Sequence, residues 1–447
     1  MLLTAEWILP VTTPPIKGGA IVIRDGLIEA IGKEEKIKKQ FSGEEVIGFD
    51  KAILLPGFVD AHTHLEYSAF RGICDDLPFS LWKIQVTEKS NYLNKKDWEI
   101  SADIGALEAI QSGITCIGDI TMTGASLRAA KRANLRGVIF FEISEMDSSK
   151  TVKTMEKAEQ GIREWQEEVK GTNLQIGISP YSVYNVAPTL FQAVSKFAQK
   201  KDLLLGLHLA GSKDEYDFVK YGAGPLAIEY RKKSGWEDVL WQPMGVSPVK
   251  YVENWDVFDS NVLAVHCIQV NEQDIDVLKR YDVRIVHCPK CSAKLGMGIA
   301  PLLSFINRGL AVGIGTDSPA SNNTMDLFDE MRIGLLLQRG MVGTVEQTSA
   351  ESFLEMATLG GAKALRLDDK IGSLEKGKEA DIISVDISKS HQVPLQSPYS
   401  ALVYTSNQEN ILMTMVKGEI LYLNQESKKL NDKEILRKSE PIKSKLM

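Results

Sequence analysis

Two histidines separated by a single residue form the first pattern in the chain that is suited to chemistry. His62 and His64 follow an apolar run that is typical of a buried strand with a polar end. Side chains alternate along a strand, so residues two apart point to the same side. Both imidazoles can therefore reach one metal ion. Such a pair also occurs by chance, and its meaning depends on the rest of the chain.

The other histidines occupy similar positions. The chain has 6 histidines, and all but His391 follow apolar, strand-like segments: His62, His64, His208, His266 and His287. A further apolar segment ends at Asp317. Imidazole nitrogens and a carboxylate are ligands of Zn²⁺ and Fe²⁺ in sites that keep a position open for water. The pattern predicts one such divalent ion, although His287 fits an ordinary strand-end residue equally well.

A metal ion held in this way activates water for attack on an electrophilic carbon. Asp317 can bind the metal and also accept the proton of the water, and His266 can hold the water or polarise the substrate. A tetrahedral intermediate then collapses with loss of a leaving group. The residues therefore predict an enzyme that catalyses a hydrolysis.

Alternating strands and helices are expected to position these side chains. Amphipathic stretches separate most of eight apolar strand candidates, at 53–60, 114–120, 137–143, 175–180, 203–209, 262–267, 283–288 and 311–317. This order predicts an α/β fold, a (β/α)8 TIM-type barrel, whose strand ends meet at one face. Two long connections, 65–97 and 211–259, follow strand ends and are expected to form substrate loops.

Short β segments lie on both sides of the predicted barrel. We expect residues 1–52 and 370–425 to form one small β-sandwich domain, beside a barrel at 53–369. Asp25-Gly26 and Lys417-Gly418 are typical of hairpin turns, and 401–404 resembles a further strand. The lysine-rich segment 426–447 is expected to be a charged tail or helix.

Composition limits the class of protein. The net charge of −7 argues against nucleic-acid binding, and no apolar run reaches the roughly 18 residues of a membrane span. The start of the chain lacks the features of a signal peptide. The odd count of 5 cysteines favours a reducing cytoplasm over a disulfide framework. We expect a small-molecule substrate and no membrane partner, and a homodimer or higher homo-oligomer stays open.

Several motifs together resemble the amidohydrolase superfamily: His62-Thr63-His64, Gly206-Leu207-His208, Val265-His266-Cys267, His287-Cys288-Pro289 with Lys294-Leu295-Gly296, and Gly315-Thr316-Asp317. The chain is most similar to the branch with S-adenosylhomocysteine/methylthioadenosine deaminases, aminodeoxyfutalosine deaminases and triazine chlorohydrolases. The resemblance covers nearly the whole chain. It implies that one divalent metal is held by His62, His64, His208 and Asp317, with His266 on the bound water.

The chain departs from that branch in residues around the metal. Gly211 stands where the branch has a glutamate that shuttles a proton to the substrate ring nitrogen. Tyr181 replaces a usual histidine, and Cys291-Ser292 replaces Ser-Asn. Glu215 is near in sequence, but a helix that begins there can direct it away. Asp317 alone can do the proton work, as in other branches of the superfamily.

Four residues are expected to contact the substrate. Trp82 and Glu66 belong to the first long loop, where an aromatic ring can cap a bound base or simply pack within the loop. Tyr181 and His287 lie at the ends of predicted strands.

Other interpretations of the sequence remain. Cys288 and Cys291 form a C-x-x-C pair, typical of a redox centre or half a zinc site, but no second pair completes a Cys₄ site. Three functions are open: an aminohydrolase acting on an adenine-type nucleoside of the S-adenosylhomocysteine, methylthioadenosine or aminodeoxyfutalosine class; a hydrolase of another C–N or C–Cl bond that uses only the metal and Asp317; and a metal-binding relative with impaired catalysis. The intact ligand set disfavours the third.

Overall fold

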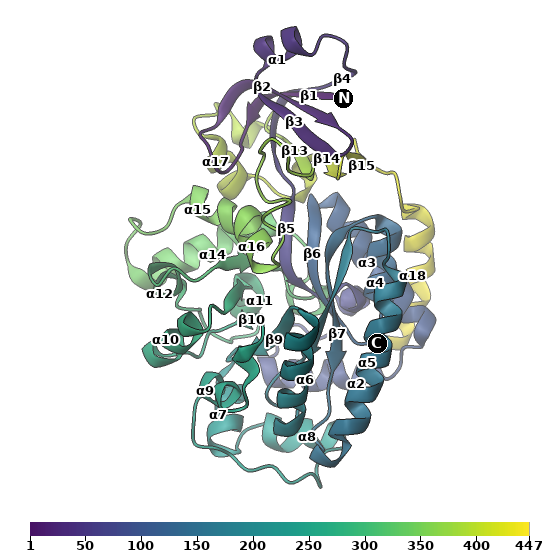
Figure 1. The fold of residues 1–447 in the computed structure, drawn as a ribbon, viewed down its shortest axis with the longest axis vertical. Helices are drawn as coiled ribbons and strands as arrows, with labels where there is room; N and C mark the ends of the chain where they lie inside the picture. The colour runs from purple at the N-terminus through teal and green to yellow at the C-terminus, as the bar shows by residue number, and fades with distance from the viewer. Residues whose placement is uncertain (447) are drawn as a thin grey trace.

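The computed structural model describes residues 1–446, which form two sheets with helices packed mainly around one of them (Figure 1). The first sheet is entirely parallel and follows the chain order from β5 to β12. Its strands are β5 (Phe58–Thr63), β6 (Ile114–Thr121), β7 (Arg136–Ile143), β8 (Leu174–Pro180), β9 (Leu205–Leu209), β10 (Val262–His266), β11 (Arg284–His287) and β12 (Val312–Ile314).

The first and last of these strands meet, so the sheet is nearly closed into a barrel. Thr63 and Asp317 form a parallel bridge, and the Asp317 N–H donates to the His62 carbonyl at 3.0 Å. This contact confirms the predicted (β/α)8 barrel. It also brings the ends of β5 and β12 side by side, although 254 positions separate Thr63 from Asp317.

Helices and short turns cover the barrel and connect its strands (Figure 1). After β5 come η1 (Leu65–Phe70), α2 (Phe79–Ser90) and α3 (Lys95–Gln111), and after β9 come α7 (Lys213–Tyr221), η3 (Leu226–Tyr230), α8 (Arg231–Lys233), α9 (Pro248–Asn254) and η4 (Val257–Asp259). The other helices of this part are α4 (Ala125–Ala133), η2 (Ser148–Lys150), α5 (Thr151–Glu168), α6 (Pro188–Lys201), α10 (Glu272–Arg280), α11 (Pro289–Lys294), α12 (Leu302–Asn307), α13 (Pro319–Asn322), α14 (Leu327–Val342), α15 (Ala350–Glu355), η5 (Met356–Gly360) and α16 (Gly361–Ala364).

The second sheet combines strands from both ends of the chain and lies at the top of Figure 1. Its order is β16-β15-β14-β13-β4-β1-β2-β3, so β4 pairs with an N-terminal strand on one side and a C-terminal strand on the other. The strands are β1 (Leu2–Ile8), β2 (Ile16–Arg24), β3 (Leu27–Lys33), β4 (Val46–Pro56), β13 (Ile382–Asp386), β14 (Ile411–Val416), β15 (Glu419–Leu423) and β16 (Glu426–Ser427), with α1 (Glu34–Gln40) beside them. Both predicted hairpins are present.

The segment that we expected to be one strand, 53–60, is divided between the two sheets. Pro56 ends β4 and Phe58 begins β5, with Gly57 at the junction. A Cβ atom on Gly57 would lie 2.2 Å from the Thr115 side chain, so the close approach of the two backbones requires glycine here. The apolar run was continuous in sequence because both of its halves are buried.

The C-terminal part differs from the expectation at one point. Residues 401–404 lie in a helical turn, η7 (Ala401–Thr405), and the strand predicted there is wrong. Pro398 starts the preceding turn α17 (Pro398–Ser400) and directs the chain into helical geometry. The short turns η6 (Ser390–Gln392) and η8 (Gln408–Asn410) flank this segment.

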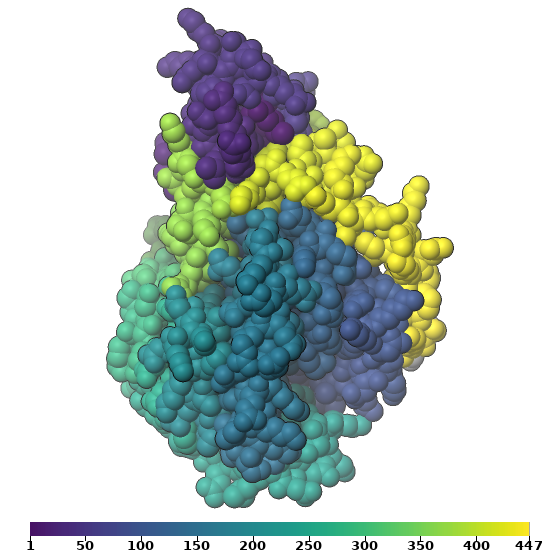
Figure 2. Space-filling model, turned by 45° about the vertical axis from the view of Figure 1, so that its right-hand side comes forward, coloured from purple at the N-terminus to yellow at the C-terminus, as the bar shows by residue number. Residues whose placement is uncertain are grey.

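The chain then ends in α18 (Asp432–Leu446), the helix predicted as one alternative for this segment. This helix runs along the barrel against α3, which Figure 2 shows as the yellow segment beside the blue one. Ile442 and Leu446 are buried there. Within residues 1–446, no helix combines the length and the apolar composition that crossing a membrane requires.

Candidate metal centre and active-site cavity

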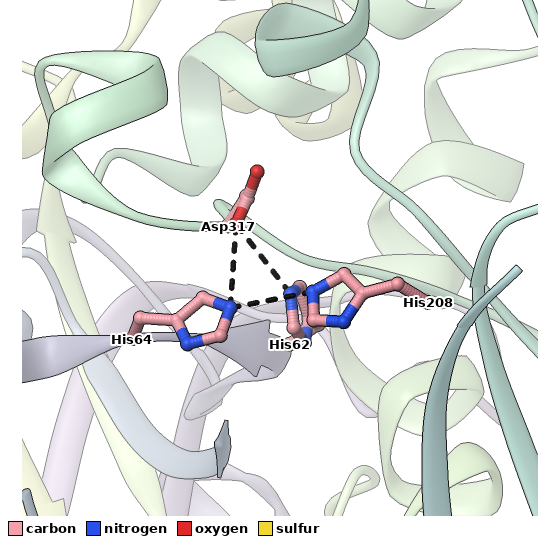
Figure 3. A group of neighbouring side chains, drawn as sticks. All are labelled: His62, His64, His208 and Asp317. Atoms are coloured by element: carbon pink, nitrogen blue, oxygen red, sulfur yellow. Dashed lines mark hydrogen bonds and ion pairs between the residues drawn. The ribbon is translucent and has the colours of Figure 1, made fainter. Parts of the chain in front are cut away.

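Three histidines and one aspartate converge at the mouth of the barrel (Figure 3). His62 and His64 come from the end of β5, His208 from β9, and Asp317 from the segment after β12. All four are buried, and their candidate ligand atoms lie within 4.8 Å of one another. They are the four residues that the sequence resemblance implied as metal ligands.

The distances between these atoms suit a small cation. His64 Nε2 lies 3.3 Å from His208 Nε2, and Asp317 Oδ1 lies 3.5 Å from His62 Nε2 and 3.7 Å from His64 Nε2. Tetrahedral ligands about 2.0–2.1 Å from a zinc ion are separated by about 3.3 Å. The spacing therefore fits a zinc-sized ion.

Hydrogen bonds determine which ring nitrogens are free to bind a metal. Nδ1 of His64 lies 2.8 Å from the Ile120 carbonyl oxygen, and Nδ1 of His208 lies 3.0 Å from that of Tyr181. A carbonyl oxygen only accepts, so each Nδ1 donates its proton and each neutral ring keeps a lone pair on Nε2. These lone pairs face each other and repel unless a cation lies between them. Nε2 of His62 is buried without a hydrogen-bond partner among residues 1–446.

Electrostatics maintain these protonation states. Burial lowers the pKa of His64 to about 3 and that of His208 well below its ordinary value, so both rings are neutral at pH 7. Burial alone would raise the pKa of Asp317, but the neighbouring histidines, His62 first, hold it well below its usual range. His64 and His208 thus present neutral imidazoles beside the Asp317 carboxylate, and these are donor types of a Zn²⁺ or Fe²⁺ site.

The second oxygen of the aspartate is held by two donors on the opposite side. Ser321 Oγ donates to Asp317 Oδ2 at 3.0 Å, and the Cys291 thiol donates to the same oxygen at 2.8 Å. Asp317 itself has a φ of +59°, which non-glycine residues rarely adopt. Cys291 therefore helps to orient the carboxylate of Asp317.

The C-x-x-C pair is part of this site and is not a separate centre. All 5 cysteines are free thiols, and burial raises the pKa of both Cys288 and Cys291 well above the ordinary value. Protonated thiols are poor nucleophiles and poor metal ligands. In the part of the chain that the structure describes, neither thiol joins a cluster of metal-binding groups.

A cavity adjoins the four clustered residues, and His64, His208 and Asp317 form part of its wall. The two long loops supply seven of its fifteen lining residues: Tyr67, Phe79, Trp82, Lys83 and Val86 come from the first, and Gly211 and Glu215 from the second. Strand ends and the segments that follow them add His64, Tyr181, Tyr184, His208, His266, Met297, Asp317 and Ser318.

Of the four residues expected to contact the substrate, two line the cavity and two do not. Trp82 and Tyr181 line the cavity, and the Trp82 indole N–H donates to the Ala320 carbonyl at 3.2 Å. Glu66 lies outside the wall, fully buried, and its carboxylate accepts hydrogen bonds from Thr121 and the backbone of Met122. His287 also lies outside the wall, and neither of its ring nitrogens has a partner among the described residues.

His266 lines the cavity beside the cluster, as its expected role requires. Its φ is +76°, and its ring centre lies 5.6 Å from that of His208. Burial lowers the pKa of His266 to about 4, so the ring is neutral, and its Nδ1 has no hydrogen-bond partner within residues 1–446. It can therefore hydrogen-bond to a water molecule or a substrate.

Glu215 turns back toward the position of the missing glutamate instead of pointing away. Its carboxylate accepts the backbone N–H groups of Ala210 at 2.7 Å and Gly211 at 2.8 Å. It is buried yet borders the cavity, and burial raises its pKa to about 7. One sequence feature hints at this position: Ser212 caps α7 and so starts the helix close to the strand end.

Lys83 is the cavity residue that sequence reasoning missed. It lies on α2, is only 9% exposed, and donates to the Tyr181 hydroxyl at 2.6 Å. Burial lowers its pKa to about 8, so most of the side chain is still charged at pH 7. A lysine side chain is usually solvated, and no local signal marks this one as buried.

Comparison with known proteins agrees with this geometry. Residues 53–421 match the model of the Amidohydrolase family. The chain is 31% identical to 5-methylthioadenosine/S-adenosylhomocysteine deaminase of Moorella thermoacetica over 96% of this chain and 95% of that protein.

Two solved structures share the fold over the whole of this chain. An adenosine deaminase from Xanthomonas campestris with bound zinc has a TM-score of 0.87 and 24% identity, over 98% of its own length. The zinc complex of atrazine chlorohydrolase from Arthrobacter aurescens TC1 has a TM-score of 0.84 and 20% identity, over 100% of its length.

Proposed function

Because the chain belongs to the amidohydrolase family, we propose that it is a metal-dependent aminohydrolase that releases ammonia from an adenine-type nucleoside. The observation that carries the proposal is the convergence of the free Nε2 lone pairs of His64 and His208 with Asp317 Oδ1 below a cavity. The relatives named as deaminases support the type of bond. The substrate class is that of S-adenosylhomocysteine, methylthioadenosine or aminodeoxyfutalosine.

We assign one divalent ion to His62, His64, His208 and Asp317, with Zn²⁺ preferred to Fe²⁺ because of the tetrahedral spacing. When bound, the ion supplies a Lewis acid that makes water nucleophilic near neutral pH. The cytoplasmic location and the oligomeric state stay predictions from the sequence.

The protein's own groups move the protons. Asp317 is ionised at neutral pH, so Oδ1 can accept a proton from the attacking water and later give it to the leaving nitrogen. Cys291 and Ser321 hold Oδ2 and so fix the direction of Oδ1. His266, neutral and in the cavity wall, positions the water or the substrate. Addition of water gives a tetrahedral carbon, which then loses ammonia.

A second function is favoured by one observation, the absence of a side chain at Gly211. Without a carboxyl group there, a reaction that does not require protonation of a ring nitrogen is the simpler one. Hydrolysis of a C–Cl bond or of another C–N bond needs only the metal and Asp317. Release of chloride instead of ammonia would identify this alternative.

The test combines metal analysis with turnover. Purified protein should contain about one Zn²⁺ or Fe²⁺ per chain, and His62→Ala or Asp317→Ala should lose it. Asp317→Asn should lower ammonia release from methylthioadenosine or S-adenosylhomocysteine by roughly 10²-fold or more. His391→Ala is the matched control, since this exposed histidine is remote from the cluster in sequence and in the fold. Full metal loading without turnover on any nucleoside or chlorinated triazine would instead support the metal-binding relative.

A further inference from the structure

A buried cation with unused hydrogen-bond donors forms part of the cavity wall. The Lys83 ammonium group carries three N–H donors. Among residues 1–446 it makes one hydrogen bond, to the Tyr181 hydroxyl, and it lies 4.2 Å from the centre of that ring. No carboxylate of the described chain lies within 4.0 Å of Nζ, and Glu142 and Asp317 act on it only from a greater distance.

Burying the Lys83 ammonium group with unsatisfied N–H donors costs free energy unless a ligand accepts hydrogen bonds from them. A buried charge is stable when it is paired and its hydrogen bonds are satisfied. Lys89, which is also on α2, is a useful comparison. It donates to the Leu446 carbonyl oxygen and does not line the cavity. Lys83 instead lines the cavity, where a ligand can accept hydrogen bonds from its remaining N–H groups.

The neighbours of Lys83 define what kind of ligand fits. Phe79, Trp82 and Tyr184 give the cavity aromatic walls that suit a planar ring. The Tyr181 hydroxyl accepts from Lys83 and so keeps its own proton to donate. Two donors therefore meet at one side of the cavity, where an oxygen atom with negative charge can accept from both.

The position of this pair is close to the reacting centre. The Tyr181 ring centre lies 4.5 Å from that of the metal-cluster residue His208. A group bound by the pair is thus near the carbon that water attacks. An unsubstituted adenine ring has only neutral nitrogens at its edge and offers no such oxygen.

We propose that Lys83 and Tyr181 bind a negatively charged oxygen of the substrate, either a carboxylate or an ionised ring oxygen, carried by the aromatic ring that is hydrolysed. This inference rests on the proposed release of ammonia at the metal centre, and it favours amino-substituted rings that carry such an oxygen over the adenine ring of the nucleosides named above. Lys83 is a specificity-determining residue in this account, because it distinguishes anionic rings from neutral ones.

Binding of two simple aromatic probes tests the proposal without turnover. Benzoate carries the anionic oxygen, and benzamide is its neutral counterpart of nearly the same shape. Isothermal titration of the zinc-loaded protein with each probe compares wild type with Lys83→Met, Lys83→Gln and Lys83→Arg. Lys89→Met is the matched control on the same helix. Zinc content and thermal unfolding are measured for every variant, and Lys83→Gln replaces Lys83→Met if the latter does not fold.

The expected result is selective. Loss of a charge-assisted hydrogen bond in Lys83→Met should raise the Kd for benzoate roughly 10- to 100-fold. The Kd for benzamide should stay within about 3-fold, and Lys83→Arg should retain most of the benzoate affinity, because it keeps the charge. Lys89→Met should behave as wild type.

Two results would overturn the proposal. One is an unchanged Kd for benzoate in Lys83→Met and Lys83→Gln. The other is an equal loss of affinity for benzoate and for benzamide, which would show that Lys83 only shapes the cavity. Failure of the proposed function differs from failure of this inference. In that case the zinc-loaded protein shows no turnover, but Lys83→Met still weakens the binding of benzoate selectively.

Discussion

At the scale of single residues, Gly211 is the position where the expected proton-transferring side chain is missing, although the four candidate metal-binding residues are all present. Its backbone is outside the left-handed region, so a side chain is tolerated conformationally. The space beside Gly211 is limited, because a Cβ atom on this residue would lie 3.0 Å from Met297 Cε and 3.1 Å from His266 Cδ2. The methionine can move, whereas the histidine is part of the site.

We expect Gly211→Glu, combined with Met297→Ala to make room, to raise ammonia release from an adenine-type nucleoside. A general acid at this position contributes up to roughly 10²–10⁴-fold in rate. Gly211→Gln with Met297→Ala is the control, because it has the same shape without an acidic proton. Fast turnover by the wild type and slower turnover by Gly211→Glu would show that another acid has the role, with Glu215 next to be mutated.

Residues of the site could be predicted from the sequence where a local pattern marks them. The clustering of His62, His64, His208 and Asp317 follows from strand period and strand ends, which are local properties, whereas their selection from the other strand-end histidines came from the family resemblance. Lys83 was not, because its burial depends on where α2 lies over the barrel, which no nearby residue encodes.

At the scale of elements, a buried ion pair joins the barrel to the composite sheet. Arg136, the first residue of β7, donates from Nε to Asp381 at 2.7 Å and from Nη2 to the same carboxylate at 3.0 Å. Their side chains are 5% and 1% exposed. Asp381 directly precedes β13, so the pair fixes the approach of a C-terminal strand to the barrel.

Arg136→Met should lower the free energy of unfolding by roughly 3–5 kcal/mol, because it leaves Asp381 buried without its partner. Denaturant unfolding followed by circular dichroism measures this change. Arg132→Met is the control: the side chains of its ion pair with Asp103 are 43% and 22% exposed, so the pair is much less buried and should contribute no more than about 1 kcal/mol. Arg136→Met/Asp381→Asn should recover part of the loss, and a double variant weaker than Arg136→Met would contradict this explanation.

The elements themselves were predictable where the hydrophobic pattern is unambiguous. All eight barrel strands and both hairpins were found, because each has a buried run bounded by turns. The first of these eight predicted segments, 53–60, also contains the end of β4, because burial continues across the junction at Gly57. The strand at 401–404 failed because a short apolar run suits a buried helical turn as well.

At the scale of the whole molecule, the four proposed metal ligands come from the first strand, the fifth strand and the segment after the last strand of the barrel. A bound ion therefore ties β5, β9 and the segment after β12 together. A ligand that binds only the folded state stabilises it by about 4 kcal/mol at a concentration of 1,000 Kd.

Removal of the metal should consequently lower the Tm. For a chain of 447 residues, about 4 kcal/mol corresponds to a shift of about 4 °C. Scanning calorimetry with EDTA, and again after addition of Zn²⁺, measures the shift and its reversal. His62→Ala should show no response to Zn²⁺, whereas His391→Ala should respond as wild type. An equal response in His62→Ala would place the zinc elsewhere.

The pairing of β4 with β13 also has a consequence for synthesis on the ribosome. About 330 residues lie between these strands, and at roughly 5–20 residues per second the later strand emerges some 15–65 s after the earlier one. During that interval one edge of β4 offers free backbone groups to other chains. The nascent protein thus has an aggregation-prone edge for almost the entire time in which its barrel is being made, and a chaperone that covers this edge would protect the newborn enzyme.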